Sequence, residues 1–208
     1  MSKPGRFLVS PNRVDWLTLG SLLLSAWGLW SALRGYLTLA VSLMLLAMLV
    51  DMFDGVLARR LGLASDFGRY LDSFCDVFTY LALPLFVLYQ LGLRDPVSGT
   101  ALFIFLTSGL LRLSRFNMIG TVEDRGVQYH RGLQVVWSQL LVVLAFPAWY
   151  WLGGRARYAL IPALLLMSLF MVLDIRVRKP TRYRLYSVLI LAVGAWFAYL
   201  HWSGVRVP

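Results

Sequence analysis

The sequence predicts an all-α fold, a polytopic membrane helix bundle with about seven transmembrane helices. Hydrophobic residues make up 59% of the 208-residue chain, and the mean hydropathy is +0.69, whereas soluble domains are roughly half apolar. The excess lies in long blocks such as residues 37–50 and 159–173, and apolar blocks of this kind are typical of membrane helices. Since the spans take up most of the chain, we expect one domain, residues 1–208.

The apolar blocks define the candidate spans, and a basic segment precedes them. Residues 1–13 combine the apolar run from Phe7 to Val9 with flanking cations, a composition that favours an interfacial segment on the membrane surface. The candidate spans are residues 14–33, 36–58, 69–93, 97–117, 132–153, 157–174 and 183–203.

The net charge of +10 would indicate a nucleic-acid partner in a soluble protein. In a membrane chain, basic loops instead mark the cytoplasmic side. If the spans alternate from a cytoplasmic N-terminus, about three in four of the Lys and Arg residues fall on that side. We therefore expect an integral protein of a bacterial or archaeal inner membrane, with its N-terminus inside, its C-terminus outside and no nucleic-acid partner.

Four of the ten acidic residues lie at the predicted cytoplasmic ends of the second and third spans. Asp51 and Asp54 are three residues apart, and Asp72 and Asp76 are four residues apart, so each pair shares one helix face. A carboxylate in a membrane helix costs about 3 kcal/mol on insertion scales and marks a functional site by default. Because the connection between the spans is short, we expect the two pairs to meet in one pocket.

Such a pocket predicts a metal centre. Four neighbouring carboxylates do not all stay ionised without cations, and oxygen-only ligands favour Mg²⁺, Mn²⁺ or Ca²⁺ over zinc. We expect Mg²⁺ or Mn²⁺, and a shared cluster has room for two ions, the usual arrangement for in-line displacement at phosphorus.

Small and basic residues beside the aspartates indicate a ligand that carries phosphate. Gly55 and Ala58 follow Asp54 on the same helix, and Gly68 opens the third span; all three leave room for a bulky group. Arg59 has the geometry to donate a forked pair of hydrogen bonds to phosphate. The alternatives are close helix packing through the small residues and a positive-inside role for Arg59.

Together these positions spell a known pattern. The text DMFDGVLAR from Asp51, then eight residues, then GRYLDSFCD to Asp76 resembles the CDP-alcohol phosphotransferase signature at every fixed position. The resemblance implies transfer of a phospho-alcohol from a CDP-alcohol to an acceptor hydroxyl, and it implies a homodimer. It implies metal-ligand roles for the four aspartates, a general-base role for Asp76, and CDP contacts for Gly55, Ala58, Arg59 and Gly68.

The acceptor is predicted from a second set of residues. The segment LRLSRFN at 111–117 and the segment LDIR at 173–176 resemble the phosphatidylserine synthase branch, although that branch usually has Ala at Ser114. The resemblance implies CDP-diacylglycerol as donor and serine as the first expected acceptor. Arg112 and Arg115, three residues apart on one helix face, are predicted to bind the acceptor's carboxylate or phosphate; the alternative is a positive-inside role.

One departure leaves the acceptor open. The serine branch usually carries Gly-Leu-Pro at the start of the fifth span, where this chain has Gln134 in place of proline, followed by Trp137 and Gln139. A bulkier, more polar pocket favours another acceptor, such as choline, an inositol phosphate or glycerol phosphate. The polar run at 123–131 is expected to be a cytoplasmic loop that caps the site.

Two other classes of protein compete with the transferase. Intramembrane aspartates also bind ions in cation transporters, but transport sites tend to lie near the midplane, often at broken helices in paired repeats. The chain shows no such repeat, and its aspartates lie near one face beside Arg59. A lipid-binding relative without activity is disfavoured by the complete set of four aspartates.

Overall fold

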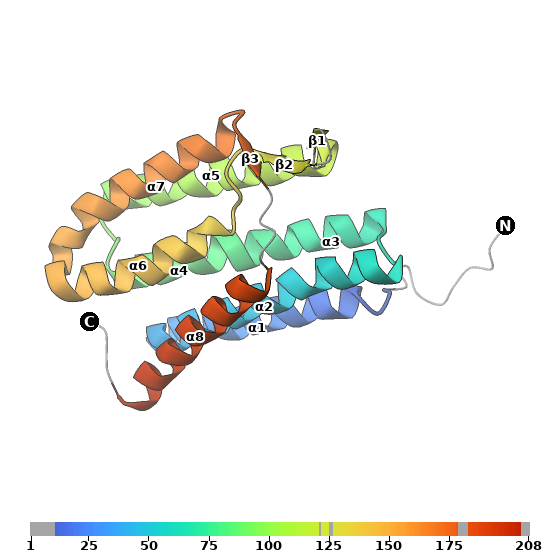
Figure 1. Ribbon diagram of the computed structural model, residues 1–208. Coiled ribbons are helices and arrows are strands. Elements are labelled where there is room, and N and C mark those ends of the chain that lie inside the picture. Colours follow the sequence, from blue (N-terminus) through green and yellow to red (C-terminus); the bar gives the residue numbers. More distant parts are fainter. Residues whose placement is uncertain (1–10, 121, 125–126, 179–182, 205–208) are drawn as a thin grey trace.

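The computed structural model describes residues 11–120, 122–124, 127–178 and 183–204, which form a helix bundle with a small sheet at one end (Figure 1). The helices in the first half are α1 (Asp15–Leu33), α2 (Leu37–Leu61), α3 (Asp66–Asp76), the π-helix η1 (Val77–Ala82), α4 (Leu83–Leu91) and α5 (Pro96–Ile119). The remaining elements are β1 (Val122–Asp124), β2 (Val127–Arg131), α6 (Trp137–Leu152), the 3₁₀ turn η2 (Gly153–Ala156), α7 (Arg157–Val172), β3 (Arg176–Arg178) and α8 (Tyr183–Trp202).

The prediction of an all-α membrane bundle is confirmed. Six helical stretches in the described part of the chain are long and apolar enough to cross a membrane. The longest, residues 137–172, turns back on itself at η2 (Figure 1), so its arms α6 and α7 have only 16 residues each. Seven spans result only when these arms are counted separately. The predicted interfacial segment lies outside the described residues, apart from residues 11–13.

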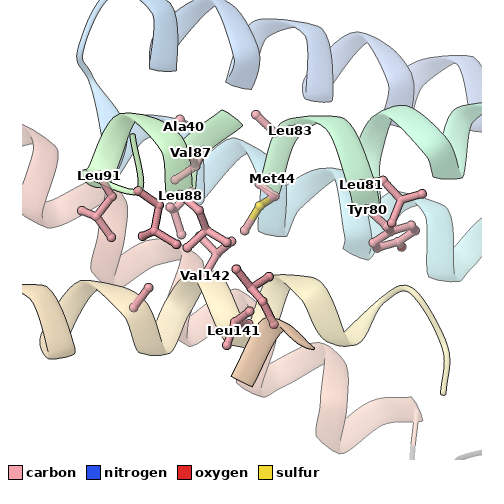
Figure 2. Packing of buried hydrophobic residues seen from close by; sticks show 14 of the residues in the cluster. Ala40, Met44, Tyr80, Leu81, Leu83, Val87, Leu88, Leu91, Leu141 and Val142 are labelled. Atoms are coloured by element: carbon pink, nitrogen blue, oxygen red, sulfur yellow. The ribbon is translucent and has the colours of Figure 1, made fainter. Parts of the chain in front are cut away.

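The helices pack in a defined order around one core. The most extensive contacts join α1 to α2, α2 to α8 and α5 to α7, while α4 and α6 lie between these groups (Figure 1). Aliphatic side chains such as Met44, Leu81, Val87 and Val142 fill the centre (Figure 2). Many large apolar side chains instead point outward, as expected for helices that face lipid rather than water.

The helix that follows the second aspartate pair changes its winding at a proline. Pro84 has no N–H group, so it cannot donate to the carbonyl of Tyr80 four residues earlier. The hydroxyl of Ser138 in α6 donates to this carbonyl instead, at 2.6 Å. Residues 77–82 form the wider π-helical turn η1, a form that is frequent at functional sites. The start of α6 is thereby held against the helix that carries Asp76.

A glycine allows α5 to approach this same turn. A Cβ atom at Gly109 would lie 2.4 Å from Cδ2 of the fully buried Leu81, closer than side chains pack. Small residues at helix interfaces in membranes have this effect. Asp95 caps the start of α5: its carboxylate accepts hydrogen bonds from Ser98 Oγ and from the backbone N–H groups of Val97 and Ser98. These bonds, with the Ser98 hydroxyl first, lower the pKa of the Asp95 carboxyl.

The expectation of a loop at 123–131 was wrong. β1 and β2 pair antiparallel, and β2 pairs antiparallel with β3 from beyond α7. Asp174 accepts a hydrogen bond from Arg131 Nη1 at 3.3 Å and forms an ion pair with Arg115 at 3.6 Å, which ties the sheet to the end of α5. At Gly132, φ is +78° and a Cβ atom would lie 2.5 Å from the carbonyl oxygen of Met171, so the chain needs glycine where the sheet leads into α6.

Candidate active site

Three of the four predicted metal-binding aspartates lie together between α2 and α3. One carboxylate oxygen from each of Asp51, Asp72 and Asp76 lies within 4.8 Å of the others. The group forms because the chain turns at Gly62, which ends α2 with φ at +66°, and returns antiparallel as α3 (Figure 1). Oxygen donors this close together suit a hard divalent cation, so these residues fit the metal that the sequence predicts.

Asp54 lies beside this group rather than within it. Its side chain is 3% exposed, and its Oδ2 accepts a hydrogen bond of 2.7 Å from Thr18 Oγ1 of α1. Asp54 nevertheless remains within electrostatic range of Asp51 and Asp72. The two predicted pairs therefore approach one another, with Asp54 turned toward α1.

A tyrosine from η1 orients the first aspartate. The hydroxyl of Tyr80 donates to Asp51 Oδ2 at 2.7 Å, and Tyr80 is 4% exposed. Its backbone carbonyl accepts the hydrogen bond from Ser138 described above. A continuous set of contacts thus runs from the start of α6 through Tyr80 to Asp51 of the carboxylate group.

The start of α1 forms one wall of the site. Asn12 Oδ1 accepts hydrogen bonds from the N–H groups of Val14 and Asp15, and Asp15 Oδ2 accepts one from the N–H of Asn12, a reciprocal cap. Asn12 Nδ2 also donates to the carbonyl of Leu63 in the turn between α2 and α3. Asp15 is 4% exposed, and its Oδ1 lies 3.0 Å from where a Cβ atom of Gly68 would stand. Any larger residue than glycine at 68 would therefore meet this carboxylate.

The predicted CDP-contacting positions lie on one face of α2, near its C-terminal end, and at the start of α3. The guanidinium of Arg59 folds back toward Gly55, where a Cβ atom would lie 3.5 Å from Arg59 Nη1. Arg59 is within electrostatic range of Asp54 and Asp72. The N–H of Gly68 donates to Ser65 Oγ, the cap of α3, at 3.0 Å. Ala58 is one residue from Arg59 on α2 and half-buried.

The two predicted acceptor arginines lie in different environments. Arg112 is 8% exposed, its Cζ lies 5.3 Å from the Phe116 ring, and its Nε has no hydrogen-bond partner among the described residues. It is within electrostatic range of Asp76. Arg115 is more exposed and pairs with Asp174 at 3.6 Å. Arg112 therefore lies near the carboxylate group, whereas Arg115 belongs to the contacts of the sheet.

The comparison with known proteins identifies the family. The family profile described as CDP-alcohol phosphatidyltransferase matches residues 11–202 of this chain. The chain belongs to this family.

Curated relatives of this phosphatidyltransferase carry more specific names. The chain is 32% identical over 133 residues to the CDP-diacylglycerol–serine O-phosphatidyltransferase of Bacillus subtilis. This alignment covers 62% of this chain and 73% of the relative. It is 35% identical over 102 residues to the protein of the same name from Methanocaldococcus jannaschii, covering 48% of this chain and 50% of that one. A phosphatidylcholine synthase of Agrobacterium fabrum is 29% identical, over 74% of this chain and 61% of its own.

Family membership favours the transferase over the cation transporter as the meaning of the buried aspartates. The motif positions were visible in the sequence, but several of their partners were not. Thr18, Tyr80 and Ser138 all bond to the aspartates or to the helices that carry them. The one indication in the sequence was that these are polar side chains within apolar spans, because a polar side chain in a membrane needs a hydrogen-bond partner. One further link, from Ser73 Oγ to Asn117 Oδ1 at 2.9 Å, joins α3 to the LRLSRFN segment.

Proposed function

We propose that this membrane phosphatidyltransferase transfers the phosphatidyl group of CDP-diacylglycerol to serine and releases CMP. The observation that carries the proposal is the buried Arg112 beside Asp76, with an Nε that has no partner among the described residues. An acceptor with a carboxylate would complete the hydrogen bonds of this guanidinium. The names of the Bacillus and Methanocaldococcus relatives support serine over other acceptors.

The donor would bind at the end of α2. Gly55, Ala58 and Gly68 leave space for the CDP group, and Arg59 would donate to its pyrophosphate. We propose that Asp51, Asp54, Asp72 and Asp76 hold two Mg²⁺ or Mn²⁺ ions. When bound, such ions neutralise the pyrophosphate and the charge that develops on the departing phosphate.

The reaction is an in-line displacement at phosphorus. The serine hydroxyl oxygen forms a bond to the phosphorus that carries the diacylglycerol. The bond from this phosphorus to the bridging oxygen of CMP breaks, and CMP leaves with that electron pair. Asp76 accepts the hydroxyl proton as general base, and the Tyr80 hydroxyl holds the neighbouring Asp51 in place.

Choline is the second candidate acceptor. A phosphatidylcholine synthase is among the relatives, and Trp137, 43% exposed at the start of α6, has a ring suited to a quaternary ammonium group. Choline lacks a carboxylate, however, and would leave Arg112 Nε without a hydrogen-bond acceptor. Inositol phosphate and glycerol phosphate would supply an anion to Arg112, but they find no support in the names of the relatives described above.

The setting of the enzyme completes the proposal. We propose that the enzyme lies in a bacterial or archaeal inner membrane with its aspartates at the cytoplasmic face, an orientation that the bias of cations supports. CDP and serine would be dissolved on that side while the acyl chains stay in lipid. A homodimer remains a prediction from the resemblance to the family.

A CMP-release assay tests the acceptor. The purified enzyme, in micelles containing CDP-diacylglycerol and Mg²⁺, is given serine, choline, inositol phosphate or glycerol phosphate in turn. We expect turnover with serine, and a rise in the KM for serine of about tenfold or more in Arg112→Gln, since a hydrogen bond to a charged group contributes about 1.5–3 kcal/mol. Turnover with choline alone, or an unchanged KM in the variant, contradicts the assignment.

A further inference from the structure

A second buried polar side chain near the site has no assigned role. Gln139, in the first turn of α6, is 1% exposed, yet neither its Oε1 nor its Nε2 has a hydrogen-bond partner among the described residues. Burying an amide without a partner costs roughly 1–3 kcal/mol by protein mutational data, and a lipid-embedded protein offers no bulk water to relieve it. A carboxamide retained at that cost indicates a partner that binds there.

The residue before Gln139 is linked to the carboxylate group. The preceding residue, Ser138, bonds to the backbone of Tyr80, whose hydroxyl reaches Asp51. Gln139 therefore directly follows the residue that begins a series of contacts, from Ser138 through Tyr80 to Asp51, one of the predicted metal ligands.

The helix geometry gives the depth of the carboxamide. Met44 of α2 points toward Val142 of α6 in Figure 2, and the two helices run antiparallel and in contact (Figure 1). From this level, Asp51 lies two turns along α2, or about 10 Å, on the same face as Met44. Gln139 lies about one turn along α6 in the same direction, on the Val142 side, and helical side chains point toward the N-terminus. The carboxamide thus points toward the end of the bundle that carries Asp51.

We propose that Gln139 is a specificity-determining residue that binds the ammonium group of the acceptor. Its Oε1 accepts a hydrogen bond from the acceptor's ammonium N–H, while Arg112 donates to the acceptor's carboxylate. Arg112 lies on α5 and Gln139 on α6, and both helices contact η1 directly after Asp76. A fixed cation on one side and a neutral oxygen acceptor on the other match the two charged groups of an amino acid. This inference rests on the proposed transferase function and deepens it.

The test compares Gln139→Met, which keeps the length of the side chain and removes its polar atoms, with the wild-type enzyme. We expect the KM for serine to rise about tenfold, corresponding to one lost hydrogen bond to a charged group, with the KM for CDP-diacylglycerol unchanged. The thermal unfolding temperature should not fall, because replacing an unpaired buried amide by an apolar group of the same shape is neutral or stabilising. A control is Gln90→Met near the end of α4, fourteen residues after Asp76, whose carboxamide bonds to Arg94.

A pair of acceptors isolates the ammonium contact. 3-Hydroxypropionate has the hydroxyl and the carboxylate of serine but no ammonium group. The wild-type enzyme should prefer serine, and Gln139→Met should lose this preference while its KM for 3-hydroxypropionate stays at the wild-type value. An unchanged KM for serine, an equal rise for both acceptors, or a lowered unfolding temperature with unaltered KM values overturns the inference.

The outcomes separate this inference from the proposed function. If the wild-type enzyme releases no CMP with serine but does so with choline, serine is wrong as the acceptor. The quaternary ammonium of choline has no N–H group to donate to Gln139, so this result would overturn the inference together with the proposed acceptor. Turnover with serine and an unchanged KM for serine in Gln139→Met would overturn the inference alone.

Discussion

The carboxylate of Asp76 meets the requirements of a base for the acceptor hydroxyl. It lies within 4.8 Å of the carboxylates of Asp51 and Asp72 and within electrostatic range of Arg112, the residue proposed to bind the acceptor. It lies in the last turn of α3, directly before η1, which Ser138 of α6 holds through a hydrogen bond to the carbonyl of Tyr80. At the scale of single residues, the site therefore depends on side chains whose partners come from three or more helices.

Asp76→Asn should reduce CMP release by roughly 10²- to 10⁴-fold, because the variant cannot accept the hydroxyl proton, while CDP-diacylglycerol still binds. A CMP-release assay measures the loss of rate, and a binding measurement with CDP-diacylglycerol checks that the donor still binds. Asp66→Asn is a matched control, since Asp66 is an exposed residue of the same helix paired with Arg69, and it should retain full activity. Turnover near the wild-type rate in Asp76→Asn would contradict the general-base role of Asp76.

Gly68→Ala should weaken donor binding through Asp15. The added Cβ atom would meet Asp15 Oδ1 at 3.0 Å and Ser65 Oγ at 3.2 Å, so the start of α3 or the cap of α1 must shift. We expect a higher KM for CDP-diacylglycerol and a loss of about 1–3 kcal/mol in the free energy of unfolding, typical of overpacking. Gly99→Ala in α5, where nothing lies within 4 Å of the new atom, serves as control. Wild-type values in Gly68→Ala would show that the contact is unimportant.

At the scale of elements, the π-helix η1 connects the aspartate helix to α6. Pro84 removes one backbone donor, and Ser138 supplies a replacement at the carbonyl of Tyr80. The same turn directs the Tyr80 hydroxyl to Asp51. Because the backbone carbonyl of Tyr80 is bonded to α6 and its hydroxyl to Asp51, a substitution at the start of α6 should alter the position of the carboxylate group.

Ser138→Ala should leave the buried Tyr80 carbonyl with no donor at the site of Pro84. We expect a loss of about 1–3 kcal/mol in the free energy of unfolding, together with a lower kcat as Tyr80 and Asp51 lose their fixed positions. Ser168→Ala in α7 is the matched control: Ser168 is equally buried, and its hydroxyl donates to the Leu164 carbonyl within its own helix. Equal unfolding temperatures and rates for the two variants would contradict the role given to Ser138.

The parts of the site that depend on local spacing were predictable, and those that depend on helix neighbours were not. Helical periodicity alone placed Asp72 and Asp76 on one face, and a short turn brought that face to Asp51. No local pattern says that α1 would present Thr18 to Asp54 and turn it away from the other three. The strands β1 and β2 were missed because a polar run by itself is typical of a loop, and because β3, which pairs with β2, follows α7 far along the chain.

At the scale of the whole molecule, the carboxylate group lies where α2 and α3 face each other, and these helices contact most of the bundle. Three carboxylates within 4.8 Å repel one another when ionised. A divalent cation bound between them would join two helices that otherwise repel at this end. Metal binding should therefore affect both activity and the stability of the folded protein.

Chelation by EDTA should abolish CMP release, and Mg²⁺ or Mn²⁺ should restore it. The same titration, followed by thermal unfolding of the purified protein, should raise the unfolding temperature of the wild-type enzyme. A ligand that binds only the folded state at 100 times its Kd contributes about 2.7 kcal/mol. In Asp72→Asn the metal-dependent rise should be much smaller, because one of the three clustered ligands loses its charge. Full activity in EDTA would rule out the metal, whereas an equal rise in both proteins would place the ion away from these aspartates.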